Sequence, residues 1–382
     1  MGNMVGNMGC DIVKKLVKWF SRFGQGVVLG LVSVAFQLLI ALFPEYDKMK
    51  LKPTYKGENK MEKASLLWRI KDAIRWRRKH IGFGFRVLRF SSPKEIAPPL
   101  KERFHYFLAT LRVLLPIPDR YMERRAEMFA LGLRLVSENE KEEIYERKGL
   151  LYAVPKGRNF WGELFSLIPR IHLMSQYQEP PVVVGEGDIV IDCGANIGIA
   201  SLLFAKRAGK SGKVIAIEPE EKNYEALKKT AKLNEGKIAH IIPLKIAVYK
   251  ENRKLELFIS DYVGSHTISP YLEERTERLK GDREIINAVK VDTLVEELGL
   301  ERVDFIKMDI EGAEVDALLG AEETISQFKP KLAICTYHRP TDPIEIRKIL
   351  SKYNPNYKFK EIERGEKVLF AWDETRLGKN RF

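Results

Sequence analysis

Two groups of residues in this chain have the types and the spacing of ligand-binding or catalytic sites. The first group surrounds a glycine turn. An apolar run at 189–191 ends at Asp192, and the turn at 194–198 leads directly into an apolar helical pattern. A strand, a glycine turn and a helix start form the nucleotide cradle of an α/β sheet, because glycine lets a ligand approach the backbone and the helix N-terminus offers free N–H groups. The alternative is a tight strand-to-helix turn that binds no ligand.

The residue that ends the next apolar run favours the ligand. The run at 213–217 leads into Glu218, whose carboxylate is placed to accept hydrogen bonds from the two hydroxyls of a ribose. The turn lacks the G-x-G-x-x-G spacing of dinucleotide sites, because Ala195 and Asn196 follow Gly194. The pattern therefore indicates an adenosyl ligand rather than a dinucleotide.

The second group combines acids and a histidine at two further strand ends. Asp309 ends an apolar run, Glu311 and Glu314 lie just beyond it, and ligands of open sheets bind at this edge. Acids there suit hydroxyl binding, proton removal or a hard cation, and the alternative is the capping of a helix N-terminus. His338 ends the following run and is the best single candidate for a general base, with His266 as the second. The alternative is a loop histidine that the backbone satisfies.

An alternation of strand and helix patterns from residue 182 onward must position these groups. Such alternation predicts a parallel sheet covered by helices, and the last two strands flank a short turn and form an antiparallel hairpin. The expected core strands are 189–191, 213–217, 240–248, 304–309 and 332–337, with extra strands at 255–259 and 288–291 and hairpin strands at 357–362 and 367–372.

The basic residues gather in the first part of the chain. The 382 residues carry a formal net charge of +13, but residues 1–160 hold 31 Lys and Arg against 16 Asp and Glu, and the remainder holds 34 against 36. A basic N-terminal part suits an acidic surface, either a membrane or a nucleic acid. The three cysteines form no C-x-x-C pair, so they support neither a zinc ribbon nor a redox pair, and they fit a reducing compartment.

Residues 11–43 predict contact with a membrane. Residues 11–23 form a basic amphipathic pattern, and 23–43 carries no charge over 21 residues, enough to cross the hydrocarbon of a bilayer. A buried helix is the alternative. We expect a membrane-associated protein with its α/β domain in the cytoplasm. The expected domains are 1–47 with the candidate span at about 23–43, a basic and mainly helical region at 48–170, the α/β domain at 171–375 and a tail at 376–382.

Amphipathic patterns divide the region before the α/β domain. They predict helices at 62–79, 99–115 and 119–137, a charged exposed segment at 138–147 and a strand at 150–154. The first helix runs into basic residues interleaved with aromatic ones, which suit anionic lipid headgroups or a phosphate backbone. A solvated helix face is the alternative.

Four short motifs together resemble the FkbM family of S-adenosylmethionine-dependent methyltransferases. They are D-x-G-A-N-x-G at 192–198, E-P at 218–219, V-D-T-L at 291–294 and K-x-D-x-E-G-x-E at 307–314. The resemblance covers about residues 180–372. It implies a Rossmann-like class I methyltransferase sheet, S-adenosyl-L-methionine as the cofactor, and transfer of a methyl group to a hydroxyl of a sugar, a glycolipid or a related small molecule.

The same resemblance implies roles for individual residues. Asp309 and Glu311 would face the transferred methyl group, with His338 as the candidate base. No set of metal ligands is predicted, although the clustered carboxylates leave magnesium open. The implied cofactor-binding residues are Asp192, Gly194, Ala195, Asn196, Gly198 and Glu218.

Two functions from other classes were weighed against this one. The basic N-terminal half suits a nucleic-acid methyltransferase, but the N/D-P-P-Y/F tetrad typical of amino-methylating enzymes is replaced by D-I-E-G at 309–312. A membrane-surface scaffold without activity is opposed by the intact acids at 309, 311 and 314. The sequence therefore favours a small-molecule or glycan acceptor, argues against a nucleic-acid partner and indicates no oligomeric state.

Overall fold

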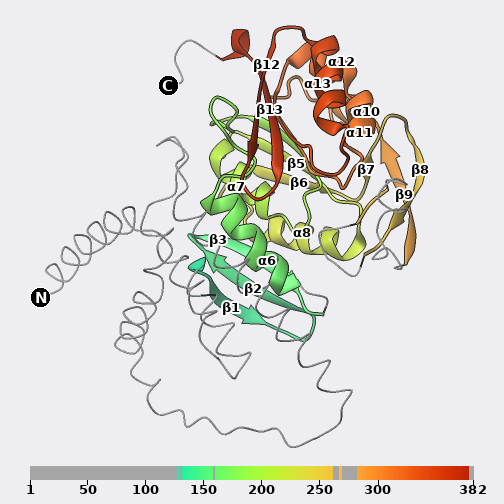
Figure 1. The fold of residues 1–382 in the computed structure, drawn as a ribbon. Coiled ribbons are helices and arrows are strands. Elements are labelled where there is room, and N and C mark those ends of the chain that lie inside the picture. Colours follow the sequence, from blue (N-terminus) through green and yellow to red (C-terminus); the bar gives the residue numbers. More distant parts are fainter. Residues whose placement is uncertain (1–127, 129–130, 158–159, 261–265, 269–281, 378–382) are drawn as a thin grey trace, which may run out of the picture. The chain divides into compact units, whose positions relative to one another are not determined.

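The computed structural model describes residues 128, 131–157, 160–260, 266–268 and 282–377, which all lie in one compact unit, Arg75–Phe382 (Figure 1). Within these ranges no helix is both long enough and apolar enough to cross a bilayer. The predicted membrane contact at 11–43 and the predicted helices at 62–79 and 99–115 fall outside the described residues and stay predictions.

A seven-stranded sheet forms the centre of this unit. Its strands are β4 (Ile189–Cys193), β5 (Lys213–Ile217), β6 (His240–Leu244), β10 (Phe305–Met308), β11 (Lys331–Cys335), β12 (Tyr357–Glu363) and β13 (Lys367–Asp373). Their order is β12-β13-β11-β10-β4-β5-β6. The strands from β11 to β6 in this order run parallel, whereas β13 is antiparallel to both β11 and β12. The predicted Rossmann-like α/β class with a C-terminal hairpin is confirmed.

Apolar side chains on both faces of the sheet explain why the core strands read as unbroken hydrophobic runs. Val190 packs into one core and Ile191 into the other, as the two-residue period of a strand requires. The first core takes α7 (Ile199–Ala208) and α8 (Glu221–Leu233), and the second takes α10 (Val291–Glu297), α11 (Glu314–Leu319), α12 (Glu322–Phe328) and α13 (Asp342–Tyr353). The sheet is therefore buried between two layers of helices.

The order of the strands reverses between β4 and β10. After β4 the chain builds β5 and β6 on one side, and it later returns to place β10 on the other side, with Lys307 in register beside Asp192. Connections that leave in opposite directions open a crevice beyond the carboxyl ends of these two strands. The glycine turn that follows β4 and the acids that follow β10 therefore meet at one edge of the sheet.

A smaller sheet interrupts the main one in the sequence. It contains β7 (Ala247–Val248), β8 (Arg253–Phe258) and β9 (Arg283–Val289), in the order β7-β9-β8. The sequence predicted a single strand over 240–248, but the chain leaves the main sheet after Leu244 and pairs Ala247 with Ala288 of β9 instead. This sheet has its own small apolar cluster, which contains Leu257.

The chain before the main sheet forms strands where the sequence predicted helix and exposed loop. β1 (Arg134–Glu138), β2 (Glu142–Arg147) and β3 (Leu150–Pro155) form an antiparallel sheet, so the predictions for 134–137 and for 142–147 are wrong. Gly132 follows the last helical residue and has a φ of +62°, a backbone conformation that ends a helix. The strand predicted at 150–154 is confirmed as β3.

This N-terminal sheet shares a core with the main sheet. It is followed by α6 (Phe160–Ile168) and the π-helix η4 (Pro169–Leu173). Tyr145 and Leu173 are buried in the same apolar cluster as Val190. The domain boundary expected between residues 170 and 171 falls inside η4, and residues on both sides of it belong to one apolar core.

Substitution of Asn234, which links α8 to β3, should destabilise the protein. Asn234 is 1% exposed, its Nδ2 donates to the Leu151 carbonyl at 2.7 Å, and its Oδ1 accepts from the Leu151 N–H at 3.0 Å. Asn234→Ala leaves both backbone groups without a partner, and we expect the free energy of unfolding to fall by about 2–3 kcal/mol in urea denaturation. Asn287→Ala, at an exposed position of β9, is the control and should change it by less than about 0.5 kcal/mol. Equal losses in the two variants would contradict the prediction.

Candidate active site

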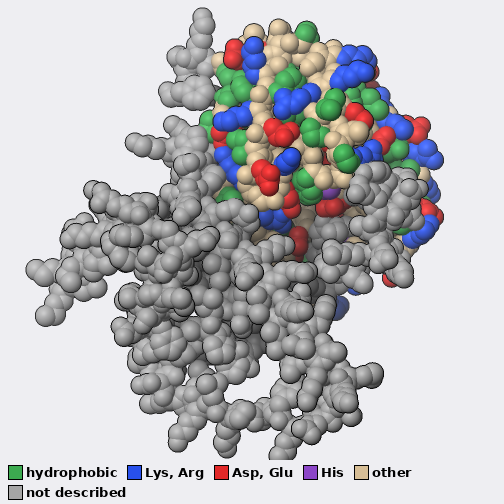
Figure 2. All heavy atoms as spheres, viewed as in Figure 1, with side chains coloured by type: hydrophobic (Ala, Val, Ile, Leu, Met, Phe, Trp, Pro, Cys, Tyr) green, Lys and Arg blue, Asp and Glu red, His purple; other side chains and the backbone are tan. Residues whose placement is uncertain are grey.

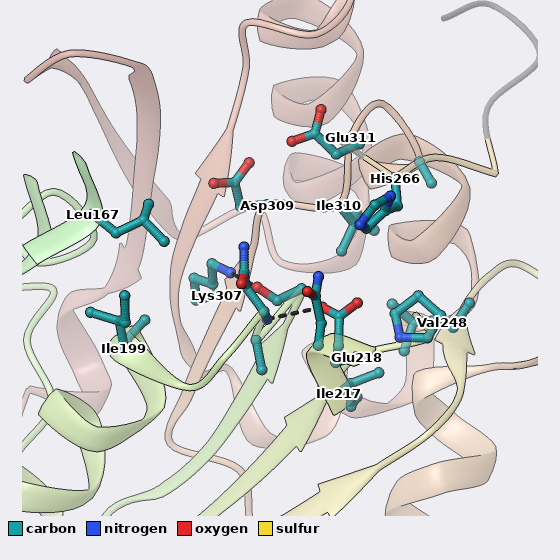
Figure 3. Close-up of a pocket in the computed structure, with 18 of the residues that line it drawn as sticks. Leu167, Ile199, Ile217, Glu218, Val248, His266, Lys307, Asp309, Ile310 and Glu311 are labelled. Carbon is teal, nitrogen blue, oxygen red and sulfur yellow. Dashed lines mark hydrogen bonds between the residues drawn. The ribbon is translucent and has the colours of Figure 1, made fainter. Parts of the chain in front are cut away.

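A pocket of about 940 Å³, including its open mouth, lies at the carboxyl edge of the sheet. Figure 3 shows Ile217 and Glu218 on one side and Asp309 and Glu311 on another, with Lys307 between them. The structure therefore brings the two groups predicted from the sequence into one cavity. Of the predicted residues, those that line it are Gly194, Ala195, Asn196, Glu218, His266, Asp309 and Glu311.

The glycine turn is held against the end of β10. Gly194 has a φ of +78°, and a Cβ atom at this position would lie 2.0 Å from the Asp309 carbonyl oxygen. Asn196 also has a positive φ of +51°, and its Oδ1 accepts a hydrogen bond from the Ile197 N–H at 2.6 Å. Gly198, at +91°, does not line the pocket and instead begins α7 close against Leu227.

Asp192 lies beneath the turn and does not line the pocket. It is fully buried, its Oδ2 accepts from the Ser201 hydroxyl at 2.6 Å, and its Oδ1 lies 3.1 Å from Lys307 Nζ. Lys307 also donates to the carbonyls of Cys193 at 3.0 Å and Gly194 at 2.7 Å. Burial disfavours the lysine cation, but the carboxylates of Asp192 and Asp309 together outweigh this effect and raise the pKa of Lys307 to about 12. This ion pair fixes the turn from below.

Glu218 closes the other side of the turn. It is 5% exposed and accepts hydrogen bonds from the N–H groups of Asn196 at 2.9 Å and Glu220 at 3.0 Å. Burial disfavours the carboxylate and raises the pKa of Glu218 to about 7, even though both N–H groups favour the ionised form. The side chain is thus fixed in place with its carboxylate at the pocket wall.

Asp309 accepts hydrogen bonds from two tyrosine hydroxyl groups. Its Oδ2 accepts from Tyr177 at 2.6 Å and its Oδ1 from Tyr337 at 3.1 Å. Burial alone would raise the pKa of Asp309, but Lys307 and His338 outweigh it and lower the pKa below its ordinary value. Asp309 is therefore an ionised carboxylate with a fixed orientation.

Glu311 is the second carboxylate in the pocket, and its backbone is in the left-handed region, with a φ of +53°. Its carbonyl oxygen accepts from the Thr267 hydroxyl at 2.6 Å, and its Oε2 lies 3.4 Å from His338 Nε2. Burial raises the pKa of Glu311 to about 7 in spite of His338. A carboxyl group with such a pKa is a stronger base than an ordinary glutamate.

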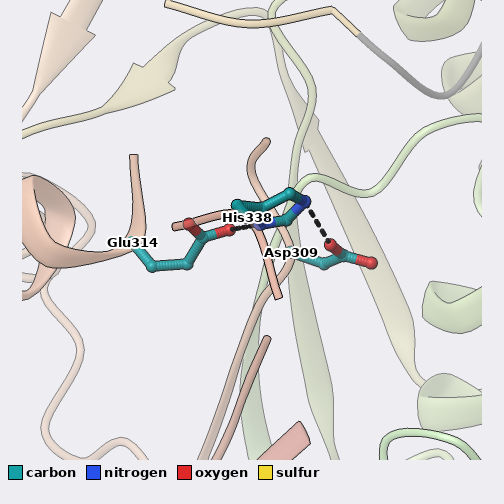
Figure 4. A group of neighbouring side chains, drawn as sticks. All are labelled: Asp309, Glu314 and His338. Atoms are coloured by element: carbon teal, nitrogen blue, oxygen red, sulfur yellow. Dashed lines mark ion pairs between the residues drawn. The ribbon is translucent and has the colours of Figure 1, made fainter. Parts of the chain in front are cut away.

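His338 stands between the carboxylates of Asp309 and Glu314 (Figure 4). Its Nδ1 lies 3.0 Å from Glu314 Oε1, and its Nε2 lies 3.7 Å from Asp309 Oδ1. Burial would lower the pKa of His338, but Glu314 and Glu311 raise it well above the ordinary value. Although its side chain is only 3% exposed, His338 is therefore a cation, and it does not line the pocket.

Three of these side chains could also be considered as ligands of a metal ion. Asp309, Glu314 and His338 offer ligand atoms within 4.8 Å of one another. The imidazole ring separates the two carboxylates, however, and each ring nitrogen faces a different one. One ion can bind only one of these nitrogens, so the arrangement favours an ion-paired imidazolium over a metal centre.

Several pocket residues carried no signal in the sequence. Glu163, Arg170 and Tyr177 come from α6, η4 and the loop after them, a stretch in which the sequence predicted no element. Tyr337 directly precedes the candidate base His338, but the sequence did not predict a role for this tyrosine. His266, the second candidate base, lines the pocket, and its Nδ1 accepts a hydrogen bond from the Ser260 N–H at 3.1 Å.

The close approach of the glycine turn to β10 predicts different costs for two glycine substitutions. Gly236 has a φ of +74° and open space around a Cβ position, so Gly236→Ala introduces backbone strain alone, about 1–2 kcal/mol. Gly194→Ala adds the clash with Asp309 to a similar strain, and we expect a loss at least about 2 kcal/mol larger in urea denaturation. Similar losses in both variants would show that the turn is free to move away from β10.

Known proteins were compared with the chain. Residues 192–359 match the family model of the methyltransferase FkbM domain. Methyltransferase sdnD of Sordaria araneosa is 31% identical over 158 residues, which are 35% of this chain and 60% of that protein. Hexuronic acid methyltransferase AglP of Haloferax volcanii is 23% identical over 182 residues, 47% of this chain and 69% of that protein.

Among solved structures, the methyltransferase FkbM from Methylobacillus flagellatus is 23% identical, with a TM-score of 0.38 over 55% of this chain and 53% of that one. The chain thus spans only part of the length of several of the proteins it matches. The family match covers both the glycine turn and the acids after β10, the two groups on which the resemblance was based. Residues 192–359 of the chain therefore resemble the methyltransferase FkbM domain, and the match includes both groups of site residues.

Proposed function

We propose that the protein transfers the methyl group of S-adenosyl-L-methionine to a hydroxyl oxygen of a sugar, a glycolipid or a related small molecule. The observation that carries this proposal is the single pocket in which Glu218 and the glycine turn face Asp309 and Glu311. A ligand-binding edge and two candidate proton acceptors are thus within reach of one bound molecule. The matched AglP is named for methylation of a hexuronic acid, which supports an acceptor of the sugar class.

The residues present fit the cofactor. The ionised Glu218 suits the two ribose hydroxyls, and the turn at Gly194 presents bare backbone to the part of the ligand that crosses it. The apolar side chains of Ile217 and Val248, beside Glu218 in Figure 3, suit the faces of an adenine ring. When bound, this cofactor supplies a methyl group on a sulfonium centre that a nucleophilic oxygen can attack.

The chain's own contribution is to place and deprotonate the acceptor. Asp309, fixed by its two tyrosine hydroxyls, can hold the acceptor hydroxyl in line, and positioning of this kind supplies much of a displacement rate. Glu311, with a pKa of about 7, can accept the proton of the hydroxyl. The sequence named His338 as the best candidate base, but its place behind both carboxylates suits the positioning of Asp309 and Glu311 instead.

The surface supports a small acceptor over a nucleic acid. On the face shown in Figure 2 the acidic and basic side chains of the described residues are interspersed. The composition agrees, since residues 161–382 hold 34 Lys and Arg against 36 Asp and Glu. Binding along a phosphate backbone relies on a surface dominated by Lys and Arg, which this face does not offer.

Cofactor affinity should follow the ionisation of Glu218. With a pKa of about 7, its carboxylate is ionised in about one tenth of molecules at pH 6 and about nine tenths at pH 8. Only the ionised form accepts hydrogen bonds with both oxygens, so affinity rises as pH rises through 7. We expect calorimetry to show about tenfold tighter binding of S-adenosylhomocysteine at pH 8 than at pH 6. Glu218→Gln should lose this dependence and bind about tenfold more weakly at pH 8.

The exposed Glu235 provides the control for this experiment, because Glu235→Gln should follow the parent protein at each pH. An unchanged pH dependence in Glu218→Gln would remove Glu218 from the cofactor site.

Removal of either pocket acid should act on methyl transfer and not on cofactor binding. We expect Glu311→Gln to lower the transfer rate by about 10²–10⁴, because a general base is lost, and Asp309→Asn to lower it through lost positioning. At saturating cofactor the parent rate should rise with pH through about 7, as Glu311 ionises. Labelled S-adenosylmethionine and fractionated cell glycans and lipids supply the assay. Normal transfer by both variants would place the chemistry elsewhere, and the exposed Glu323→Gln is the control.

A further inference from the structure

One wall of the pocket is built by residues that precede the family-matched segment. Glu163 and Leu167 of α6, Arg170 of η4 and Tyr177 after it all line the cavity, whereas the match begins at residue 192. Arg170 follows Leu167 by three residues on continuous helix, so the two side chains share one face toward the pocket. This wall carries charges of both signs.

The guanidinium of Arg170 is held in place but keeps free capacity to donate. Its Nη1 donates to Glu366 in the turn of the β12–β13 hairpin, and Gln176 donates to the other oxygen of Glu366 at 2.6 Å. Its Nε is buried and has no hydrogen-bond partner in the part of the chain that the structure describes. Since an arginine has five N–H donors in a fixed fork, a second acceptor can bind beside Glu366.

Glu163 supplies the opposite charge on the same wall. Its Oε1 accepts from Asn196 Nδ2 at 3.3 Å, which joins the wall to the glycine turn. The carboxylate retains lone pairs for a further donor. A zwitterionic group at this wall could therefore pair its anionic part with Arg170 and its cationic part with Glu163.

A ligand that lies along the pocket would have one end at the wall built by α6 and η4. In Figure 3, Leu167 and Ile199 lie at the end opposite Glu218 and Val248. A cofactor whose ribose sits at Glu218 and which crosses the glycine turn therefore ends at the α6 and η4 wall. The far end of S-adenosylmethionine is an amino acid, with an α-ammonium and an α-carboxylate.

We infer that Arg170 binds the α-carboxylate of the cofactor and that Glu163 binds its α-ammonium. The inference rests on the proposed function and extends the cofactor site beyond the family-matched segment. The competing role for Arg170 is a tether between η4 and the hairpin turn, which would affect folding and not the recognition of one end of a ligand.

Two ligands that differ only at the amino-acid end test the inference. S-adenosylhomocysteine carries the amino acid, and 5′-methylthioadenosine has the same adenosyl thioether without it. By calorimetry on the full chain, Arg170→Gln should bind S-adenosylhomocysteine about 10- to 100-fold more weakly, while its affinity for methylthioadenosine stays within about twofold. Glu163→Gln should show the same selective loss. Arg347→Gln, away from the pocket, should change neither affinity.

The other outcomes also decide. Equal weakening of both ligands in Arg170→Gln, or none, overturns the inference and leaves the proposed function standing. Failure of the parent protein to bind methylthioadenosine overturns the proposed adenosyl site itself. If Arg170→Gln has a lowered thermal midpoint, Arg170→Lys keeps the charge but loses the planar fork, and it must still show the selective loss.

Discussion

The buried ion pair between Lys307 and Asp192 is the interaction on which the site depends. It joins β10 to β4 where the strand order reverses, and both side chains are almost fully removed from water. A buried charge without its partner is costly, typically by about 3–5 kcal/mol when one member is removed. Because the same ammonium also binds the carbonyls of Cys193 and Gly194, the pair ties the start of the glycine turn to the strand that leads into the acids at 309–314.

The remaining charges alternate around this pair. Asp309 is flanked by Lys307 and His338, and His338 is flanked in turn by Glu311 and Glu314. Asp309 consequently stays ionised in a buried position. Burial raises the pKa of Glu311, and the nearby His338 offsets this effect only in part. Two carboxylates two residues apart thus differ in basicity because of their neighbours and not because of their chemistry.

The sequence predicted well what is local in the chain. The turn at 194–198 and the acids at 309 and 311 each sit in an unbroken strand, turn and helix pattern, and the parallel order of the strands then brings them together. Arg170, Glu163 and Tyr177 reach the same pocket from elsewhere, and Tyr177 bonds to a residue 132 positions away. A periodic pattern in the sequence predicts a helix or a strand, but it does not predict which distant residues come into contact. The helix expected up to residue 137 was wrong because Gly132 outweighed an apolar spacing that also fits a strand.

The shared core has a consequence for where this protein can be divided. The match to the family model covers residues 192–359. It begins within β4 and ends within β12. A fragment cut at these limits would lose β13, half of the sheet's hairpin, and would uncover the apolar surface that Tyr145 and Leu173 bury. The family-matched segment is therefore smaller than the segment whose residues share the core. A minimal soluble fragment for crystallisation or display should begin ahead of residue 131 and continue through Asp373.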